Sequence, residues 1–303
     1  MTNTLIVITG PTGVGKTELC LEVAHRYDTS IINADSRQIF KEIPIGTAAP
    51  TPEQRARVVH HLVGNHSIHD YYSAALFEQE ALETIQAIFN QGKHVAILSG
   101  GSMMYIDAVC KGIDDIPTIT EATRSLFKKR LEEEGLEALC EELKQCDPEH
   151  YGIVDLNNRR RVIHALEICH QTGRTYTSFR TNQAKQRPFD IIKIALNIPR
   201  EQLYERINNR VLDMIAYGLE AEARKVYPFR HLDSLNTVGY REMFAYFDGT
   251  YSLEEAIRRI QGNTRRYARK QLTWFKRDPS VVWFHPQEMQ EIIRHIDLRL
   301  CQS

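Results

Sequence analysis

Residues 10–17 have the composition and spacing of a phosphate-binding loop. They read Gly-Pro-Thr-Gly-Val-Gly-Lys-Thr, fit the pattern G-x-x-x-x-G-K-[ST], and stand between an apolar run and a helical pattern. Glycines let the backbone N–H groups of such a loop converge on phosphate oxygens, and the start of the following helix adds its positive end. Lys16 would add a point charge, and Thr17 a hydroxyl ligand for Mg²⁺. The sequence therefore predicts a site for a ligand with two phosphates, formed by Gly10, Thr12, Gly13, Val14, Gly15, Lys16 and Thr17.

The sequence lacks an Asp at the position where nucleotide hydrolases carry their metal-binding carboxylate. In hydrolases an apolar strand ends in an Asp that holds the metal. Here the apolar run 95–98 leads into Ser99 and a glycine turn, and the Asp that follows a strand near the loop is Asp35. We interpret the loop as a diphosphate cradle without that apparatus, and Asp35 as a proton acceptor for an incoming nucleophile. A turn or helix-capping role for Asp35 is the alternative.

Three other polar side chains are candidates for the same site. Ser102 follows the turn Gly100-Gly101, where its hydroxyl can cap a helix and also point toward Asp35. Arg206 and Arg210 are four residues apart and therefore lie on one face of a helix. Two guanidinium groups at this spacing can grip a diphosphate; without the loop they would be read as an exposed stripe.

The elements around these residues alternate short apolar runs with helical patterns. This alternation predicts βαβ units and a parallel sheet flanked by helices, hence an α/β, P-loop NTPase-like fold. We expect residues 1–116 and 186–303 to form this core together with a helical, basic C-terminal region, and residues 117–185 to form an all-helical insertion. The expected strands are 5–9, 31–33, 95–98, 191–196 and 281–284, and the expected helices are 16–27, 74–90, 123–146, 155–170, 201–227, 239–247, 253–276 and 287–300.

Positive charge is concentrated in two segments although the formal net charge is −1. Residues 159–187 contain seven Lys or Arg and one acid, and residues 258–277 contain eight Lys or Arg and no acid. Two such segments could offer a polyanion two positive surfaces, or could be ordinary solvated helix faces.

The composition limits the class of protein. The 303 residues are 42% hydrophobic and 25% charged, which are globular values. The apolar runs are far shorter than the roughly 20 residues of a membrane helix, and the first residues have no basic leader pattern. The six cysteines lack C-x-x-C spacing and are expected to be reduced thiols. We therefore expect a cytoplasmic protein that has no membrane segment. We also expect it to act as a monomer.

Together with the loop, several further stretches occur in an order typical of one family. The chain resembles the tRNA dimethylallyltransferases, the isopentenyltransferases of the MiaA type, over essentially its whole length. The stretches that carry the resemblance are Asp35-Ser36-Arg37-Gln38, Gly100-Gly101-Ser102-Met103-Met104-Tyr105, Arg161-Val162-Ile163, Arg206 to Arg210, Val238-Gly239-Tyr240-Arg241-Glu242, and residues 264–274.

The resemblance implies transfer of a dimethylallyl group from dimethylallyl diphosphate to the N6 amine of the adenosine 3′ to the anticodon, with Mg²⁺ as cofactor. It implies that Asp35 is the general base, that the Ser102 hydroxyl assists at the acceptor, and that Arg210, with Arg206 beside it, binds diphosphate. The insertion and the basic C-terminal helix would grip the anticodon stem-loop of tRNA. The implied tRNA-binding residues are Asp35, Ser36, Arg37, Gln38, Ser102, Arg124, Arg159, Arg160, Arg161, Val162, Ile163, Arg265, Arg266 and Arg269.

Two other functions fit part of the pattern. A P-loop kinase of small molecules or nucleosides would share the cradle and a catalytic Asp, but would leave the basic insertion without a use. A non-catalytic RNA-binding protein would use the basic helices but not the intact Gly-Lys-Thr. The sequence also departs from the family at Ser102, where a Thr is usual; the missing methyl group predicts a less firmly held hydroxyl.

Overall fold

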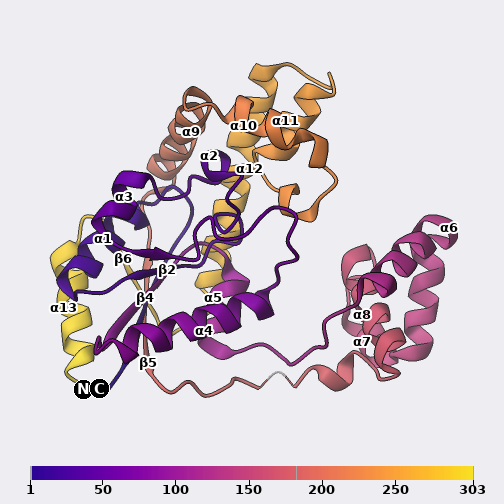
Figure 1. The fold of residues 1–303 in the computed structure, drawn as a ribbon, viewed down its shortest axis with the longest axis horizontal. Coiled ribbons are helices and arrows are strands. Elements are labelled where there is room, and N and C mark those ends of the chain that lie inside the picture. Colours follow the sequence, from indigo (N-terminus) through magenta and orange to yellow (C-terminus); the bar gives the residue numbers. More distant parts are fainter. Residues whose placement is uncertain (1, 182, 303) are drawn as a thin grey trace. The chain divides into compact units, whose positions relative to one another are not determined.

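The chain folds into two units (Figure 1). The computed structural model describes residues 2–181 and 183–302. One unit, the core, comprises Met1–Lys111 and Gln186–Ser303, and the other, the helical unit, comprises Gly112–Lys185, beginning a few residues before the expected position 117. Within the described ranges, no helix combines the length and the apolar character that crossing a bilayer would require.

The core contains the expected parallel sheet, which is confirmed. Its six strands have the order β3-β2-β4-β1-β5-β6, and every neighbouring pair is parallel. The register pairs Ile8 with Ser99 and Asn33 with Ser99, so the carboxyl ends of the first, second and fourth strands share one edge. The strands are β1 (Thr4–Thr9), β2 (Ile31–Asn33), β3 (His60–His61), β4 (Val95–Ser99), β5 (Asp190–Leu196) and β6 (Val281–Phe284).

Helices cover both faces of this sheet, because the side chains on both faces are apolar. On one face, α1 (Lys16–Arg26) and α13 (Met289–Leu300) pack on β1, β4 and β5. On the other face, α4 (Ala74–Asn90) and α5 (Met103–Lys111) bury Phe77, Ile85 and Val109. The long helix α12 (Leu253–Phe275) contributes Ala268 to the first cluster and Phe275 to the second. One helix therefore reaches both layers at the edge where the functional loops lie.

A third cluster joins the helices above that edge. It contains α9 (Arg200–Ala216), α10 (Leu219–Val226), α11 (Tyr240–Phe247) and the start of α12. The single helix expected over 201–227 is wrong: Gly218 adopts φ 99°, a conformation that favours glycine and ends the helical run. Two short helices also lie between β2 and β3, namely α2 (Pro44–Thr47) and α3 (Pro52–Arg57).

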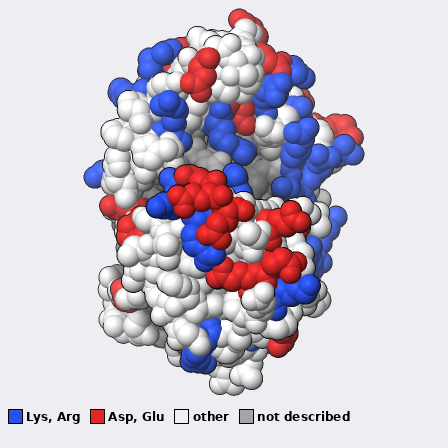
Figure 2. All heavy atoms as spheres, turned by 90° about the vertical axis from the view of Figure 1, so that its right-hand side faces the viewer, with Lys and Arg blue, Asp and Glu red and all other residues white. Residues whose placement is uncertain are grey.

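The helical unit has a core of its own. α6 (Glu121–Cys146), α7 (Pro148–Ile153) and α8 (Arg159–Thr172) enclose Phe127, Leu143 and Leu166. Gly135 interrupts α6 with φ 81°, and α8 begins only at Arg159. Acidic side chains form a patch on the face that Figure 2 shows, and α6 supplies exposed glutamates that include Glu132, Glu133, Glu134, Glu137 and Glu141.

Candidate active site

The phosphate-binding loop lies at the carboxyl end of β1 and leads into α1. Gly10, Gly13 and Gly15 have φ of 137°, 82° and 106°, and a Cβ at Gly10 would lie 2.7 Å from the Leu196 carbonyl oxygen. Lys16 Nζ donates hydrogen bonds to the carbonyl oxygens of Gly10 and Pro11, both at 2.9 Å. The loop is therefore closed around the Lys16 side chain, which holds the loop in its curved shape.

The electrostatics of the loop favour an anion. Burial, followed by the nearby Arg210, lowers the pKa of Lys16 to about 8, and Asp35 and Cys20 oppose this shift. Burial also lowers the pKa of Arg210, again opposed by Asp35. Two cations that are poorly solvated and close together gain much from a multiply charged anion between them.

Arg206 and Arg210 reach the loop from α9. Arg210 Nη1 donates to Thr12 Oγ1 at 3.0 Å, and Arg206 Nη1 donates to the Val14 carbonyl oxygen at 3.2 Å. The structure thus brings both arginines, separated from the loop by most of the chain, onto its outer side. Arg210 is half-buried there, whereas Arg206 remains exposed.

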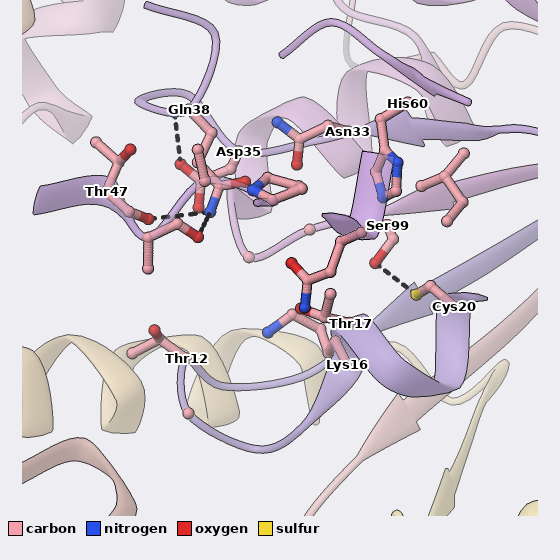
Figure 3. Close-up of a pocket in the computed structure, with 18 of the residues that line it drawn as sticks. Thr12, Lys16, Thr17, Cys20, Asn33, Asp35, Gln38, Thr47, His60 and Ser99 are labelled. Atoms are coloured by element: carbon pink, nitrogen blue, oxygen red, sulfur yellow. Dashed lines mark hydrogen bonds between the residues drawn. The ribbon is translucent and has the colours of Figure 1, made fainter. Parts of the chain in front are cut away.

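Asp35 follows β2 on the opposite side of the pocket from Lys16 and Thr17 (Figure 3). Its Oδ1 accepts hydrogen bonds from the backbone N–H groups of Arg37, at 2.9 Å, and Gln38, at 3.4 Å. Asp35 therefore does stabilise the turn, and these hydrogen bonds hold its carboxylate at the wall of the pocket. Gln38 is held in turn by donating Nε2 to the carbonyl oxygens of Thr47 and Ala48, both at 3.0 Å.

Ser102 lies directly behind Ser36. The Ser102 hydroxyl accepts the Ser36 N–H at 2.7 Å and donates to Ser36 Oγ at 3.0 Å, and it is in hydrogen-bond contact with Tyr267. These contacts fix the hydroxyl without the methyl group that a threonine would supply. Ser36, and not Ser102, lines the second of the two cavities described next.

Two cavities, of about 420 and about 390 Å³, meet at this point. The first runs along the loop past Lys16 and Thr17 to Ser99 and His60, and the second runs toward residues 236–239. Both are lined by Thr12, Asp35, Thr47, Arg210 and Tyr267. A diphosphate on the loop and a second reactant in the other cavity would therefore meet at Asp35.

Sequence reasoning missed two residues of this site, Tyr267 and Gln271, which α12 presents one turn apart. Burial and the charge of Asp35 raise the pKa of Tyr267 to about 12. Gln271 contacts the loop and the glycine turn after β4. The sequence does contain a signal for them: uncharged residues recur at helical spacing between the cations of this helix, which indicates a face that packs against the rest of the protein.

The expected tRNA-binding residues of the core have different surroundings. Arg37 lines the second cavity and donates Nη1 to the carbonyl oxygens of Asp233, at 3.2 Å, and Ser234, at 3.0 Å. Arg265 hydrogen-bonds Asn208. The side chains of Arg266 and Arg269 are exposed on α12.

The helical unit exposes only part of its expected set. Arg159, Arg160 and Arg161 are exposed at the start of α8, Arg124 and Ile163 are half-buried, and Val162 is fully buried in the core of the unit. The Val162 side chain therefore packs and does not face a ligand. Arg187, at the end of the first basic segment, is also no part of a positive surface, because it forms a buried ion pair with Glu78 at 2.5 Å.

Comparison with known proteins shows which family has this sequence and fold. Residues 38–278 match the sequence profile of the family described as IPP transferase. The chain belongs to the IPP transferase family. It is 60% identical over 296 residues to "tRNA dimethylallyltransferase 1" of Phocaeicola vulgatus, covering 98% of each chain, and 58% identical over 296 residues to that of Bacteroides thetaiotaomicron, covering 98% of this chain and 96% of the relative.

Solved structures of IPP transferases have the same fold. The tRNA isopentenylpyrophosphate transferase of Bacillus halodurans is 35% identical, with a TM-score of 0.72, over 99% of this chain and 97% of that chain. A eukaryotic dimethylallyltransferase described as acting on tRNA is 26% identical, with a TM-score of 0.76, over 90% of this chain and 70% of that chain. The family's fold therefore spans both units of the chain.

Proposed function

We propose that this enzyme transfers a dimethylallyl group from dimethylallyl diphosphate to the N6 amine of the adenosine 3′ to the anticodon of tRNA, and releases diphosphate. The names of its relatives give the reaction class. The observation that carries the proposal is that Lys16, Arg210 and Asp35 line one cavity, while the adjoining strand β4 ends in Ser99 instead of a metal-holding Asp. This combination suits departure of a diphosphate better than attack on a nucleotide phosphate.

The loop and α9 would activate the donor. The allylic C–O bond breaks more easily as negative charge on the leaving oxygens is neutralised. Lys16 and Arg210 line the first cavity together with the loop, so their charges would face those oxygens, while Arg206 holds the loop from outside through the Val14 carbonyl oxygen. The diphosphate leaves with the electron pair of the broken bond.

Asp35 would receive the proton. The adenine N6 lone pair is delocalised, so the amine needs close positioning and a base as the N–C bond forms. The adenine must leave the anticodon stack to reach the reacting carbon. The cavity that Ser36, Arg37 and Tyr267 line beside Asp35 is suited to receive it.

The protein groups near the loop fit Mg²⁺ held mainly by the substrate. Mg²⁺ in such sites is usually bound by one or two protein ligands, several waters and phosphate oxygens. The described residues contain no cluster of three or more His, Cys, Asp or Glu side chains that could hold a metal. Thr17, which lines the first cavity, would supply a hydroxyl ligand, and the ion would add charge neutralisation at the diphosphate.

Two exposed groups of arginines would hold the tRNA anticodon stem-loop. One lies on α12 of the core and includes Arg266 and Arg269, and the other opens α8 of the helical unit. All the groups assigned to the chemistry belong to the core of a single chain, which supports a monomeric enzyme. Its tRNA substrate supports a cytoplasmic location.

The test uses purified enzyme, undermodified tRNA, Mg²⁺ and labelled dimethylallyl diphosphate. Label is expected to enter the tRNA without ATP, and mapping should place it on the adenosine 3′ to the anticodon. Lys16→Met serves as the negative control: it keeps much of the side-chain length but removes the charge, so it should transfer little label. ATP turnover with phosphorylation of a small molecule, and no label in tRNA, would establish the kinase instead.

A further inference from the structure

Helix α12 enters the active site with an amide side chain that none of the roles above includes. Gln271 is 1% exposed and lines the first cavity. Its Oε1 accepts the Thr12 N–H at 2.9 Å, and its Nε2 donates to the Gly101 carbonyl oxygen at 2.8 Å. Both ends of one amide are therefore used to join two loops that are far apart in the sequence.

These two loops carry the opposite halves of the chemistry. Thr12 belongs to the phosphate-binding loop, and its hydroxyl accepts the hydrogen bond from Arg210. Gly101 immediately precedes Ser102, whose hydroxyl holds Ser36 beside Asp35. Gln271 thus spans from the groups that hold the leaving diphosphate to those that face the acceptor.

The glycine turn is packed so closely that its position depends on this contact. A Cβ added at Gly101 would lie 2.3 Å from Gln271 Nε2, and one added at Gly100 would lie 2.2 Å from the Ala34 carbonyl oxygen. The turn is therefore wedged between α12 and the residue that precedes Asp35. Removing the amide group would free one side of the wedge.

The rest of α12 is held independently of Gln271. Ala268 and Phe275 are buried on the two faces of the sheet, and Trp274 Nε1 donates to Asp107 Oδ2 at 2.9 Å. A variant that lacks only the two amide hydrogen bonds should keep the helix in place. Its effect would then be on the spacing of the two loops.

We propose that Gln271 is a positioning residue that sets the distance between the diphosphate cradle and the turn that carries Ser102. This inference rests on the proposed transferase function. The bond to Thr12 also means that the Thr12 N–H is occupied by protein, as is the Val14 N–H, which donates to the Pro11 carbonyl oxygen at 3.3 Å, so the diphosphate would use other N–H groups of the loop. Misplacing reacting groups by about 1 Å can cost about 100-fold in rate.

The principal variant is Gln271→Met, which has a similar length and no amide group. The control is Gln261→Met, the same change on the same helix, where the amide donates to the Asn208 carbonyl oxygen at 3.2 Å, outside both cavities. We expect Gln271→Met to lower kcat by about 10- to 100-fold. The Kd for tRNA, the Kd for inorganic diphosphate and the thermal midpoint should stay close to those of Gln261→Met.

A second variant, Gln271→Glu, separates positioning from simple loss of stability through its pH profile. An ionised carboxylate can accept from Thr12 but not donate to Gly101, whereas the protonated acid can do both. Burial and the charge of Asp35 raise the pKa of a carboxyl group at this position, whereas Lys16 and Arg210, which line the same cavity, lower it; at any such pKa the protonated fraction grows as the pH falls. The activity of Gln271→Glu relative to wild type should therefore rise as the pH is lowered from about 8 to about 6.

The outcomes are distinct. If wild-type enzyme does not move label into tRNA, the proposed function fails and this inference with it. If the wild type is active and Gln271→Met keeps kcat within about twofold of it, the positioning role alone fails. A parallel loss of kcat, tRNA affinity and thermal midpoint in Gln271→Met, with a Gln271→Glu ratio that does not change with pH, would make Gln271 a structural residue and overturn the inference.

Discussion

Replacing Asp35 by Asn tests the centre of the mechanism, because it removes a proton acceptor and little else. The amide oxygen of Asn can still accept the N–H groups of Arg37 and Gln38, which the Asp35 Oδ1 accepts at 2.9 and 3.4 Å. The loop after β2 should therefore keep its shape. Removal of the base should therefore appear in the chemical step and not in binding.

The magnitude follows from the role of Asp35 and from its neighbours. A positioned general base contributes about 10²- to 10⁴-fold. At 1.36 kcal/mol for each factor of ten, this is about 3–5 kcal/mol of barrier. The Asp35 charge also raises the pKa of Lys16, so its loss favours the neutral lysine while removing repulsion of the diphosphate. These two effects on donor binding oppose each other, and KM for the donor should change much less than kcat.

Single-turnover transfer of label, with enzyme in excess over tRNA, measures the chemical step directly. Asp28→Asn is a matched control, since the Asp28 side chain is 98% exposed and its partner is Lys93, away from both cavities. Asp35→Asn should be slow and bind tRNA normally, and Asp28→Asn should be normal in both respects. An Asp35→Asn enzyme that loses tRNA affinity in proportion to its rate would show that the carboxylate binds RNA and is not the base.

Three further predictions concern charge. Neutralising Arg266 and Arg269 to Gln should weaken tRNA binding and reduce the slope of log K against log salt by about 0.7–0.9 for each phosphate that these arginines neutralise in the wild type; an unchanged slope would place the tRNA surface elsewhere. Because the protonated Lys16 binds the anion and its pKa is about 8, the affinity for inorganic diphosphate should fall as pH rises through 8, and calorimetry of Lys16→Met should lack this component. Arg187→Met should cost about 3–5 kcal/mol of unfolding free energy, because it removes the cation of a buried ion pair; denaturant unfolding that shows under about 1 kcal/mol would contradict this.

Local patterns in the sequence were enough for the sheet and for the loop. The strands at 31–33 and 281–284 and the helix at 74–90 have the predicted bounds, because strong apolar runs and clear breaks define them. The two-residue strand β3 is too short to show a period, and the break at Gly218 was hidden inside a continuous helical pattern.

The candidate site was predictable where residue type alone implies chemistry, and not where a contact depends on the fold. Gln271 lies 259 residues from Thr12 and 170 from Gly101; its spacing indicates a helix face without charge, but the sequence does not show which partners the amide contacts. Val162 is the reverse case, since it belongs to a motif that suggests RNA binding but packs in the core of its unit. Motifs identify segments, whereas burial decides which side chains of a segment can meet a ligand.

The anchoring of Arg187 has a consequence for how such an enzyme can be assembled and altered. Its Nε and Nη2 donate to the carbonyl oxygens of Val109, at 2.8 Å, and Ala108, at 2.7 Å, so the chain leaves the core and re-enters it at one spot. A segment attached in this way can be exchanged, enlarged or trimmed by recombination with little strain on its host. The fold of the core can thus stay constant while the segment between Lys111 and Gln186 changes in length or sequence.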